Sequence, residues 1–304
     1  MEDVTSKTWL EVALNGPWTQ EKQAGIPIKV ADIVQQGIDC VNAGAAIVHV
    51  HAYDEGTGRQ KDDVDVYKKI IEGIRTKVDA VVYPTVPAPG MNPIEEGSSG
   101  EDRYAHIEAL AKDGFLEWTV LDPGSCNFSH YDQLKEDKVG YVYQNSEADA
   151  RQGMRIAHQY GLHPSYAIYE PGFARLGANL HWRESTPDPI YRLMFGSGFT
   201  FGFPPEDYGL TAYLILLDQV APGCNWMISG LDVNVLPLIP RVIMESGHVR
   251  VGLEDAPFGC EKTNIELVED AVNSIETCGG ELARAPEVRL AASSDKLEAM
   301  AAGM

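Results

Sequence analysis

Two histidines separated by a single residue, His49 and His51, are the side chains in this sequence best placed for chemistry. A run of small and aliphatic residues at 45–48 precedes them and predicts a buried strand. Side chains two apart on a strand point to the same face, so both imidazoles face one way. Catalytic zinc typically takes three protein ligands and keeps one open position. The pair therefore predicts two ligands of a metal site, although ordinary polar residues near the end of a core strand would show the same pattern.

Alternating strand and helix patterns must position these histidines. Short apolar runs predict strands at 9–14, 45–51, 80–85, 116–121, 165–169, 191–195, 225–229 and 249–253. Helical spacing of apolar residues predicts helices at 28–43, 63–78, 102–112, 146–160, 172–182, 210–220, 235–246 and 263–277. Eight such units imply a (β/α)₈ TIM barrel, a single domain over 1–304 with its core at about 9–285. An open doubly wound sheet is the alternative, but no strand is followed by a Gly-X-Gly-X-X-Gly turn.

The barrel predicts where the polar residues meet, because its active sites lie at the carboxyl ends of the strands. The polar residues around those ends are Asn15, His49, His51, Thr85, Asp122, Ser125, Glu170, Arg250, Glu254 and Asp255. Closure of the barrel places the eighth strand beside the first and near the second. Glu254 is then the expected third ligand of a catalytic zinc site, and Asp255 beside it is a candidate base. Taken alone, segment 252–255 is typical of a solvated turn between a strand and a helix.

The composition argues against several classes of partner and site. With a formal charge of −21 and no basic run to neutralise phosphates, a nucleic-acid partner is not expected. No apolar segment reaches the ~18 residues needed to span a bilayer. The first residues lack the pattern of a signal peptide, which favours a cytoplasmic protein without a membrane partner. Five cysteines at wide spacings favour free thiols over a disulfide framework.

Two longer segments resemble the signature stretches of a known family. Residues 49–54 and 247–255 resemble those of the β-keto acid cleavage enzymes, the family of 3-keto-5-aminohexanoate cleavage enzyme. The 247–255 stretch is quite specific, whereas the histidine pair alone is much less so. Similar matches occur at 13–16, 43–48, 263–264 and 266–269, so the resemblance runs from about residue 9 to 285.

The resemblance implies a zinc-dependent barrel that reacts a β-keto acid with acetyl-CoA and releases acetoacetate and a new acyl-CoA. It implies one Zn²⁺ per chain on His49, His51 and Glu254, with Asp255 and Arg250 catalytic. Thr85 falls where the family has a serine or threonine beside the substrate. A homo-oligomer is also implied. The other residues at the strand ends are candidates for substrate binding: Asn15, Asp122, Ser125 and Glu170.

Two departures from the family pattern lie near the expected pocket. The fifth strand usually reads Pro-Glu-X-Glu followed by Phe-Asp, whereas residues 164–170 read Pro-Ser-Tyr-Ala-Ile-Tyr-Glu and keep only the terminal acid, Glu170. Tyr53 replaces the arginine that usually precedes the aspartate of the histidine motif. Such changes indicate a different keto acid, a different acyl acceptor or lost activity. A metal-dependent barrel hydrolase and a catalytically silent zinc-binding barrel are therefore the alternative functions.

Overall fold

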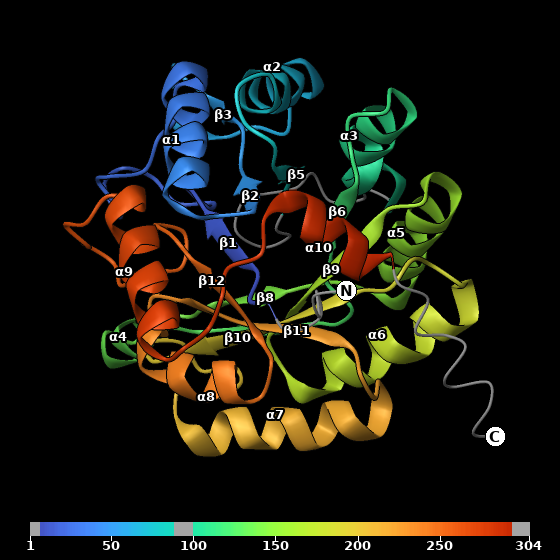
Figure 1. Ribbon diagram of the computed structural model, residues 1–304, viewed down its shortest axis with the longest axis vertical. Helices are drawn as coiled ribbons and strands as arrows, with labels where there is room; N and C mark the ends of the chain where they lie inside the picture. Colours follow the sequence, from blue (N-terminus) through green and yellow to red (C-terminus); the bar gives the residue numbers. More distant parts are fainter. Residues whose placement is uncertain (1–6, 88–99, 294–304) are drawn as a thin grey trace.

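The centre of the molecule is a sheet of eight parallel strands, and helices surround it (Figure 1). The computed structural model describes residues 7–87 and 100–293. The strand order is β5, β2, β1, β12, β11, β10, β9, β6, and the two end strands lie against each other, so the barrel is nearly closed. The prediction of a (β/α)₈ barrel is confirmed. The strands are β1 Leu10–Ala13, β2 Ile47–Val50, β5 Val81–Pro84, β6 Trp118–Leu121, β9 His163–Ile168, β10 Ile190–Gly196, β11 Asn225–Leu231 and β12 His248–Val251.

The connecting helices turn an apolar stripe toward the sheet. In α2, Ile70, Ile71 and Ile74 are buried, and the Asp63 side chain accepts hydrogen bonds from two backbone N–H groups at the helix start. Within the described ranges, no helix is both long and apolar enough to cross a membrane. The main helices are α1 Val30–Ala43, α2 Val64–Arg75, α3 Gly100–Lys112, α5 Glu147–Tyr160, α6 Pro171–Glu184, α7 Asp207–Val220, α8 Ile239–Met244 and α9 Asn264–Thr277.

Two antiparallel hairpins and two further short helices lie outside the predicted pattern. One hairpin follows the histidine strand and the other follows β6, so both stand at the carboxyl end of the barrel. Their strands are only two or three residues long, too short to give a clear alternation in the sequence. These elements are β3 Tyr53–Asp54, β4 Arg59–Gln60, β7 Cys126–Phe128, α4 Tyr131–Lys135, β8 Tyr141–Tyr143 and α10 Ala285–Ala292.

The helix predicted at 235–246 is shorter in the structure. A 3₁₀ turn, η2 (Leu236–Leu238), comes first, and regular helix covers only Ile239–Met244. Pro237 and Pro240 lie in the first positions of these two segments, where their missing N–H groups break no helical hydrogen bond. Inside a longer helix each proline would remove a hydrogen bond, so the regular helix begins only at Ile239.

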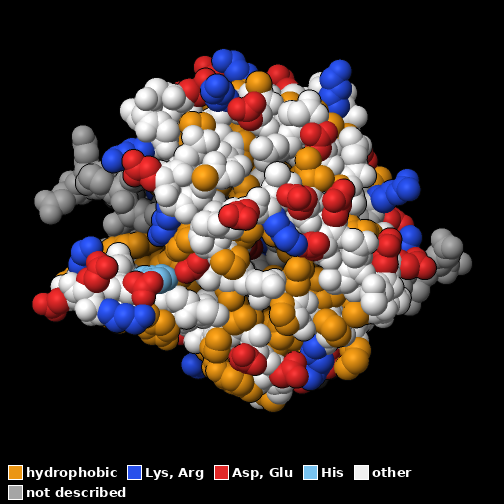
Figure 2. Space-filling model, turned by 90° about the vertical axis from the view of Figure 1, so that its left-hand side faces the viewer, with side chains coloured by type: hydrophobic (Ala, Val, Ile, Leu, Met, Phe, Trp, Pro, Cys, Tyr) orange, Lys and Arg blue, Asp and Glu red, His pale blue; other side chains and the backbone are white. Residues whose placement is uncertain are grey.

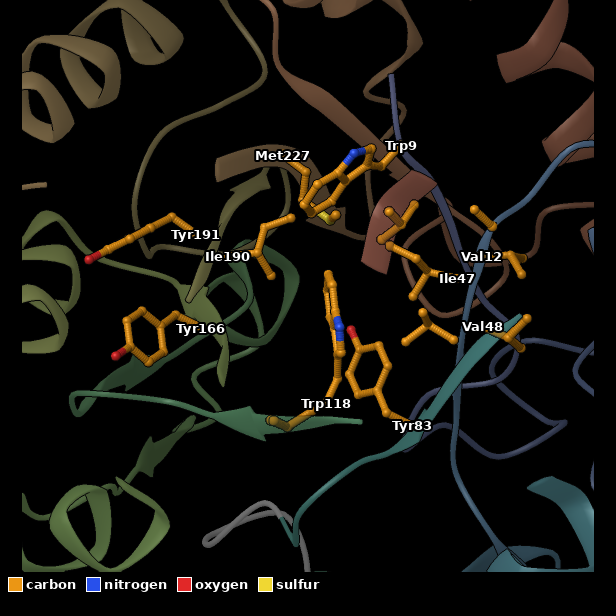
Figure 3. Packing of buried hydrophobic residues seen from close by; sticks show 14 of the residues in the cluster. Trp9, Val12, Ile47, Val48, Tyr83, Trp118, Tyr166, Ile190, Tyr191 and Met227 are labelled. Atoms are coloured by element: carbon orange, nitrogen blue, oxygen red, sulfur yellow. The ribbon is translucent and has the colours of Figure 1, made fainter. Parts of the chain in front are cut away.

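Aromatic side chains fill the amino-terminal half of the barrel interior (Figure 3). The ring centroids of Trp9 and Trp118 are 5.9 Å apart, and that of Tyr83 is 6.0 Å from Trp118. His248 stacks on Trp9 at 4.1 Å, and Met227 is fully buried in the same region. This packed layer leaves the carboxyl half of the barrel for the polar residues.

The surface reflects the negative charge of the sequence. On the face in Figure 2, Asp and Glu side chains are scattered with Lys and Arg between them, and no continuous basic area is visible there. Proteins that bind nucleic acid cluster their lysines and arginines on one face. The face in Figure 2 shows no such cluster.

Gly252 joins β12 to the acidic pair and has a backbone φ of +138°. A Cβ at this position would lie 2.1 Å from the carbonyl oxygen of Ala13 in β1. We expect Gly252→Ala to lower the free energy of unfolding by more than ~3 kcal/mol, because backbone strain and a clash with main chain add. Urea denaturation followed by circular dichroism measures the change.

The matched control is Gly259→Ala. Gly259 also has a positive φ, +76°, but no described atom lies within 4 Å of its would-be Cβ. Only the strain of the left-handed backbone remains, which costs ~1–2 kcal/mol. Equal losses in the two variants would contradict the argument that the approach of β12 to β1 requires glycine.

Candidate active site

The structure brings His49, His51 and Glu254 together at the carboxyl end of the barrel. β1 pairs with β2 on one side and with β12 on the other, so the carboxyl ends of β2 and β12 lie near each other. The Nε2 atoms of the two histidines are 3.2 Å apart, and Oε2 of Glu254 lies 3.5 Å from the first and 3.4 Å from the second. Ligand atoms at about 2.0–2.1 Å from a tetrahedral zinc ion would be separated by about 3.3 Å. The spacing of this donor set therefore fits zinc.

The protonation of the cluster also fits a cation. Burial lowers the pKa of His49 well below its usual value, which favours the neutral imidazole. Burial opposes the ionisation of Glu254, but Arg250 and the two histidines outweigh it and hold the pKa of Glu254 well below its usual range. Its buried Oε2 has no hydrogen-bond donor among the described residues. A carboxylate and an imidazole with free lone pairs are the forms that bind a metal.

A chain of hydrogen bonds behind His51 sets the orientation of its ring. Nδ1 of His51 lies 2.9 Å from Oε1 of Gln60, in the β3–β4 hairpin. The amide nitrogen of Gln60 donates to Asp62, 3.0 Å away, and the Tyr67 hydroxyl donates to the same carboxylate at 2.9 Å. Asp62 can only accept, so it directs the amide oxygen of Gln60 toward His51. His51 then carries its proton on Nδ1 and presents the Nε2 lone pair to the cluster.

Arg250 connects Glu254 of the cluster to other acidic residues in the barrel interior. Its side chain is completely buried, and one of its Nη atoms lies 2.8 Å from both Glu254 and Asp255. The other Nη lies 3.2 Å from Glu11, the register partner of Arg250 in β1. Glu11 also accepts a hydrogen bond of 2.7 Å from the Tyr83 hydroxyl. Glu11 and Tyr83 are buried polar residues inside apolar strands, a signal available in the sequence but missed by reasoning from the strand ends.

Asp255 faces Arg250 and not the cavity beside the cluster. Its carboxylate accepts hydrogen bonds of 2.8 to 3.2 Å from Arg250 and one of 3.3 Å from the backbone N–H of Gly230. Burial raises the pKa of Asp255 to about 6, against the opposing charge of Arg250. The role of Asp255 as a base stays a prediction.

A cavity lies beside the ligand cluster, and two of the predicted residues, Thr85 and Asp122, line it with the histidines and Glu254. The Tyr143 hydroxyl from the β7–β8 hairpin donates a hydrogen bond to Asp122. Other polar and aromatic lining residues were not predicted: Trp18, Tyr141, Tyr143, Tyr169 and Arg192. For Arg192 the available signal was a cation inside an otherwise apolar strand.

Three predicted substrate-binding residues lie outside the cavity lining. Asn15 is buried and bridges main-chain groups, donating to the carbonyls of Pro27 and His51 and accepting from the His51 N–H. The Ser125 hydroxyl exchanges hydrogen bonds with the backbone of Asn145. Glu170 precedes α6 and accepts a hydrogen bond of 3.3 Å from the Gly202 N–H. Their substrate roles remain untested predictions, but each side chain has a structural partner.

The ligand set predicts one zinc ion per chain. Replacing His49 with alanine removes one of the three proposed ligands. We expect zinc affinity to fall by more than about 100-fold, which exceeds the usual effect of replacing a residue that only hydrogen-bonds a ligand. Competition with a chromophoric chelator gives the affinity. The control is His163→Gln, a histidine at the start of β9 whose Nδ1 contacts the Asp188 carbonyl. Unchanged affinity in His49→Ala would contradict the assignment.

Gln60 gives a second, subtler test of the same site. Gln60→Ala leaves all three ligands in place but frees the His51 ring, so zinc affinity should fall by about 10–100-fold. Gln35→Ala, which removes an exposed glutamine that bonds only Asp39 among the described residues, should leave it unchanged. If the two variants bind zinc equally well, Gln60 does not orient the ligand.

Comparison with known proteins gives relatives along almost the entire chain. The sequence model of the family described as beta-keto acid cleavage enzyme matches residues 7–292. The 3-dehydrocarnitine:acetyl-CoA trimethylamine transferase of Rhizobium meliloti is 27% identical over 286 residues, covering 89% of this chain and 91% of that protein. A 3-keto-5-aminohexanoate cleavage enzyme of Fusobacterium nucleatum is 26% identical over 279 residues, covering 89% and 92%.

Solved structures share the fold. The apo structure of ObcA matches with a TM-score of 0.68 and 17% identity, over 87% of this chain and 64% of that one, so this chain spans less than two thirds of ObcA. A type I 3-dehydroquinate dehydratase from Clostridium difficile matches with a TM-score of 0.55 and 8% identity, over 89% and 93%. At these identities the likeness concerns the barrel alone.

The family match includes both segments that build the ligand cluster, 49–54 and 247–255. It thereby confirms the resemblance seen in the sequence. Because the match runs over residues 7–292 of 304, this chain belongs to the β-keto acid cleavage enzyme family.

Proposed function

We propose that this chain cleaves a β-keto acid with acetyl-CoA, using a zinc ion held by His49, His51 and Glu254. Family membership and the names of its relatives make it an acyltransferase that acts on keto acids with acetyl-CoA. The observation that supports the zinc proposal is the convergence of three ligand atoms, at tetrahedral spacing, beside a cavity. A homo-oligomeric state and a cytoplasmic location stay predictions.

The proposed reaction balances without water, oxidant or reductant. The carbon between the ketone and the carboxylate loses a proton, and the resulting enolate attacks the acetyl thioester. The CoA thiolate leaves and then attacks the original keto carbon. The bond between that carbon and the carbon that bears the carboxylate breaks, which leaves the remaining acyl group on CoA and releases acetoacetate as its enolate. The enolate takes back the proton that was removed in the first step.

The residues around the cluster suggest a role for individual side chains in these steps. A bound zinc ion would act as a Lewis acid toward the carboxylate and ketone oxygens of the keto acid. Asp255 is the proposed base. Because its carboxylate contacts Arg250 and does not line the cavity, the proton would need a relay, and the Thr85 hydroxyl, which lines the cavity and can both donate and accept, is the proposed relay. Arg250 contacts Asp255 and Glu254 through one Nη, so it fixes the two carboxylates relative to each other. Its buried charge also favours developing oxyanions nearby.

The test is acetoacetate production from a panel of β-keto acids by zinc-loaded protein, with and without acetyl-CoA. We expect product only when acetyl-CoA is present. Asp255→Asn should lower kcat by about 10²–10⁴-fold, the usual contribution of a positioned acid or base. Asp188→Asn, at the opposite end of the barrel, is the control. Zinc content and circular dichroism of each variant separate lost chemistry from lost structure.

Two outcomes would overturn the proposal. Cleavage of a keto acid without acetyl-CoA would favour the metal-dependent hydrolase. A protein that binds one zinc ion and yields no product from any keto acid would be the silent barrel.

A further inference from the structure

Arg192 is a buried cation at the wall of the cavity, and no carboxylate of the described residues lies closer to it than 4.0 Å. It belongs to β10, is 3% exposed and lines the cavity together with His49, His51 and Glu254. Within the described part of the chain, its guanidinium donates one hydrogen bond, of 3.2 Å, to the Ser165 carbonyl. Its buried Nε–H has no acceptor among the described residues. A guanidinium carries five donors, so most of them lack a described protein partner.

Arg250, in the same barrel, is a buried arginine whose guanidinium does have ionic partners. Three carboxylates contact its guanidinium at 2.8 to 3.2 Å. The carboxylate nearest Arg192 among the described residues is that of Asp122, and the distance of 4.0 Å is too long for a hydrogen bond. A buried charge is costly unless it is paired and hydrogen-bonded. The difference between the two arginines therefore indicates that Arg192 is completed by something outside the described residues.

Asp122 is held away from Arg192 by other donors. One of its oxygens accepts a hydrogen bond of 3.2 Å from the Ala167 N–H, and the other accepts from the Tyr143 hydroxyl. Tyr143 stands on the β7–β8 hairpin, so Asp122 is fixed between β9 and that hairpin. It cannot move to Arg192 without breaking these bonds.

The strand beside β10 offers Arg192 no acid on the shared face. Ala167 is the register partner of Arg192 on β9, and Ser165 lies two residues earlier on the same face. An acid at position 167 would lie directly opposite the Arg192 guanidinium. With alanine there, the guanidinium faces the cavity. Arg192 therefore supplies the positive charge at this wall of the cavity, and Asp122 lies 4.0 Å away.

We propose that Arg192 binds a second carboxylate at the far end of the keto acid, so that the substrate is a β-keto dicarboxylate. This inference rests on the proposed function, because it assumes that the keto acid carboxylate and ketone lie at the ligand cluster. A bidentate carboxylate supplies acceptors for the guanidinium donors that lack a partner. A cationic terminus in the same place would meet a buried like charge. Binding energy from this remote group also helps to hold the reacting carbons in place.

The test compares two substrates of equal length, 3-oxoadipate and 3-oxohexanoate, which differ by a terminal carboxylate in place of a methyl group. For the wild-type protein we expect kcat/KM with acetyl-CoA to be at least about 100-fold higher for the diacid, because a polar site strongly rejects an analogue that leaves it unpaired. In Arg192→Gln this ratio should fall at least about tenfold. Arg155→Gln, an exposed arginine on α5, should keep the wild-type ratio.

A binding measurement makes the result independent of turnover. Titration calorimetry of zinc-loaded protein with 3-oxoadipate, without acetyl-CoA, should show binding that weakens at least tenfold, on the order of the kinetic change, in Arg192→Gln. Arg192→Lys keeps the charge and serves as a second variant if Arg192→Gln does not fold. It should retain part of the preference, because lysine cannot bind a carboxylate bidentately.

The outcomes separate the two proposals. Acetyl-CoA-dependent turnover with equal kcat/KM for the two substrates, or a preference for a β-keto acid with a terminal ammonium group, would overturn the role of Arg192 and leave the proposed function standing. Absence of turnover with every keto acid would overturn the proposed function. Diacid binding that depends on Arg192 would still support the carboxylate site in that case.

Discussion

Arg250 is completely buried, and its ion pairs with three carboxylates hold the carboxyl end of the barrel together. Removing a guanidinium from water is costly, and the cost is offset only where several carboxylates with good geometry surround it. Glu11 supplies one from the first strand, while Glu254 and Asp255 supply two from the turn after the last strand. The same arginine that joins β12 to β1 therefore holds Glu254 close to the histidines.

The charges in this interior also explain why a divalent cation suits it. The buried charged groups of this interior are two guanidinium groups, Arg192 and Arg250, and four carboxylates, those of Glu11, Asp122, Glu254 and Asp255. When all are ionised, two negative charges are in excess. Burial raises the pKa of Asp255 to about 6, which shows that its ionised form is disfavoured in this interior. A divalent cation bound by the free lone pairs of the histidines and Glu254 would balance the excess negative charge. The charge of the interior and the spacing of the three residues therefore favour the same kind of ion.

Sequence reasoning predicted the barrel and the ligand cluster because both depend on simple rules. Eight strand and helix patterns imply a closed parallel sheet, and closure brings the turn after the last strand to the histidine strand. The same rule selected Asn15 and Ser125, whose side chains bond main chain, because position at a strand end does not reveal where a side chain points. It missed Arg192, which lies within a strand, and Tyr143, which reaches the cavity from a short hairpin that has no clear pattern. Such residues depend on tertiary contacts that no local pattern records.

β1 pairs with both β2 and β12, so the site combines residues that are synthesised at very different times. His49 and Glu254 are 205 residues apart, the difference between their numbers. At a synthesis rate of about 5–20 residues per second, the histidine pair leaves the ribosome roughly 10–40 s before the glutamate. For most of that interval β12, which pairs with one side of β1 in the folded protein, has not been made. The complete set of His49, His51 and Glu254 therefore exists only after residue 254 has been made, and a zinc ion bound earlier would have only two of the three proposed ligands.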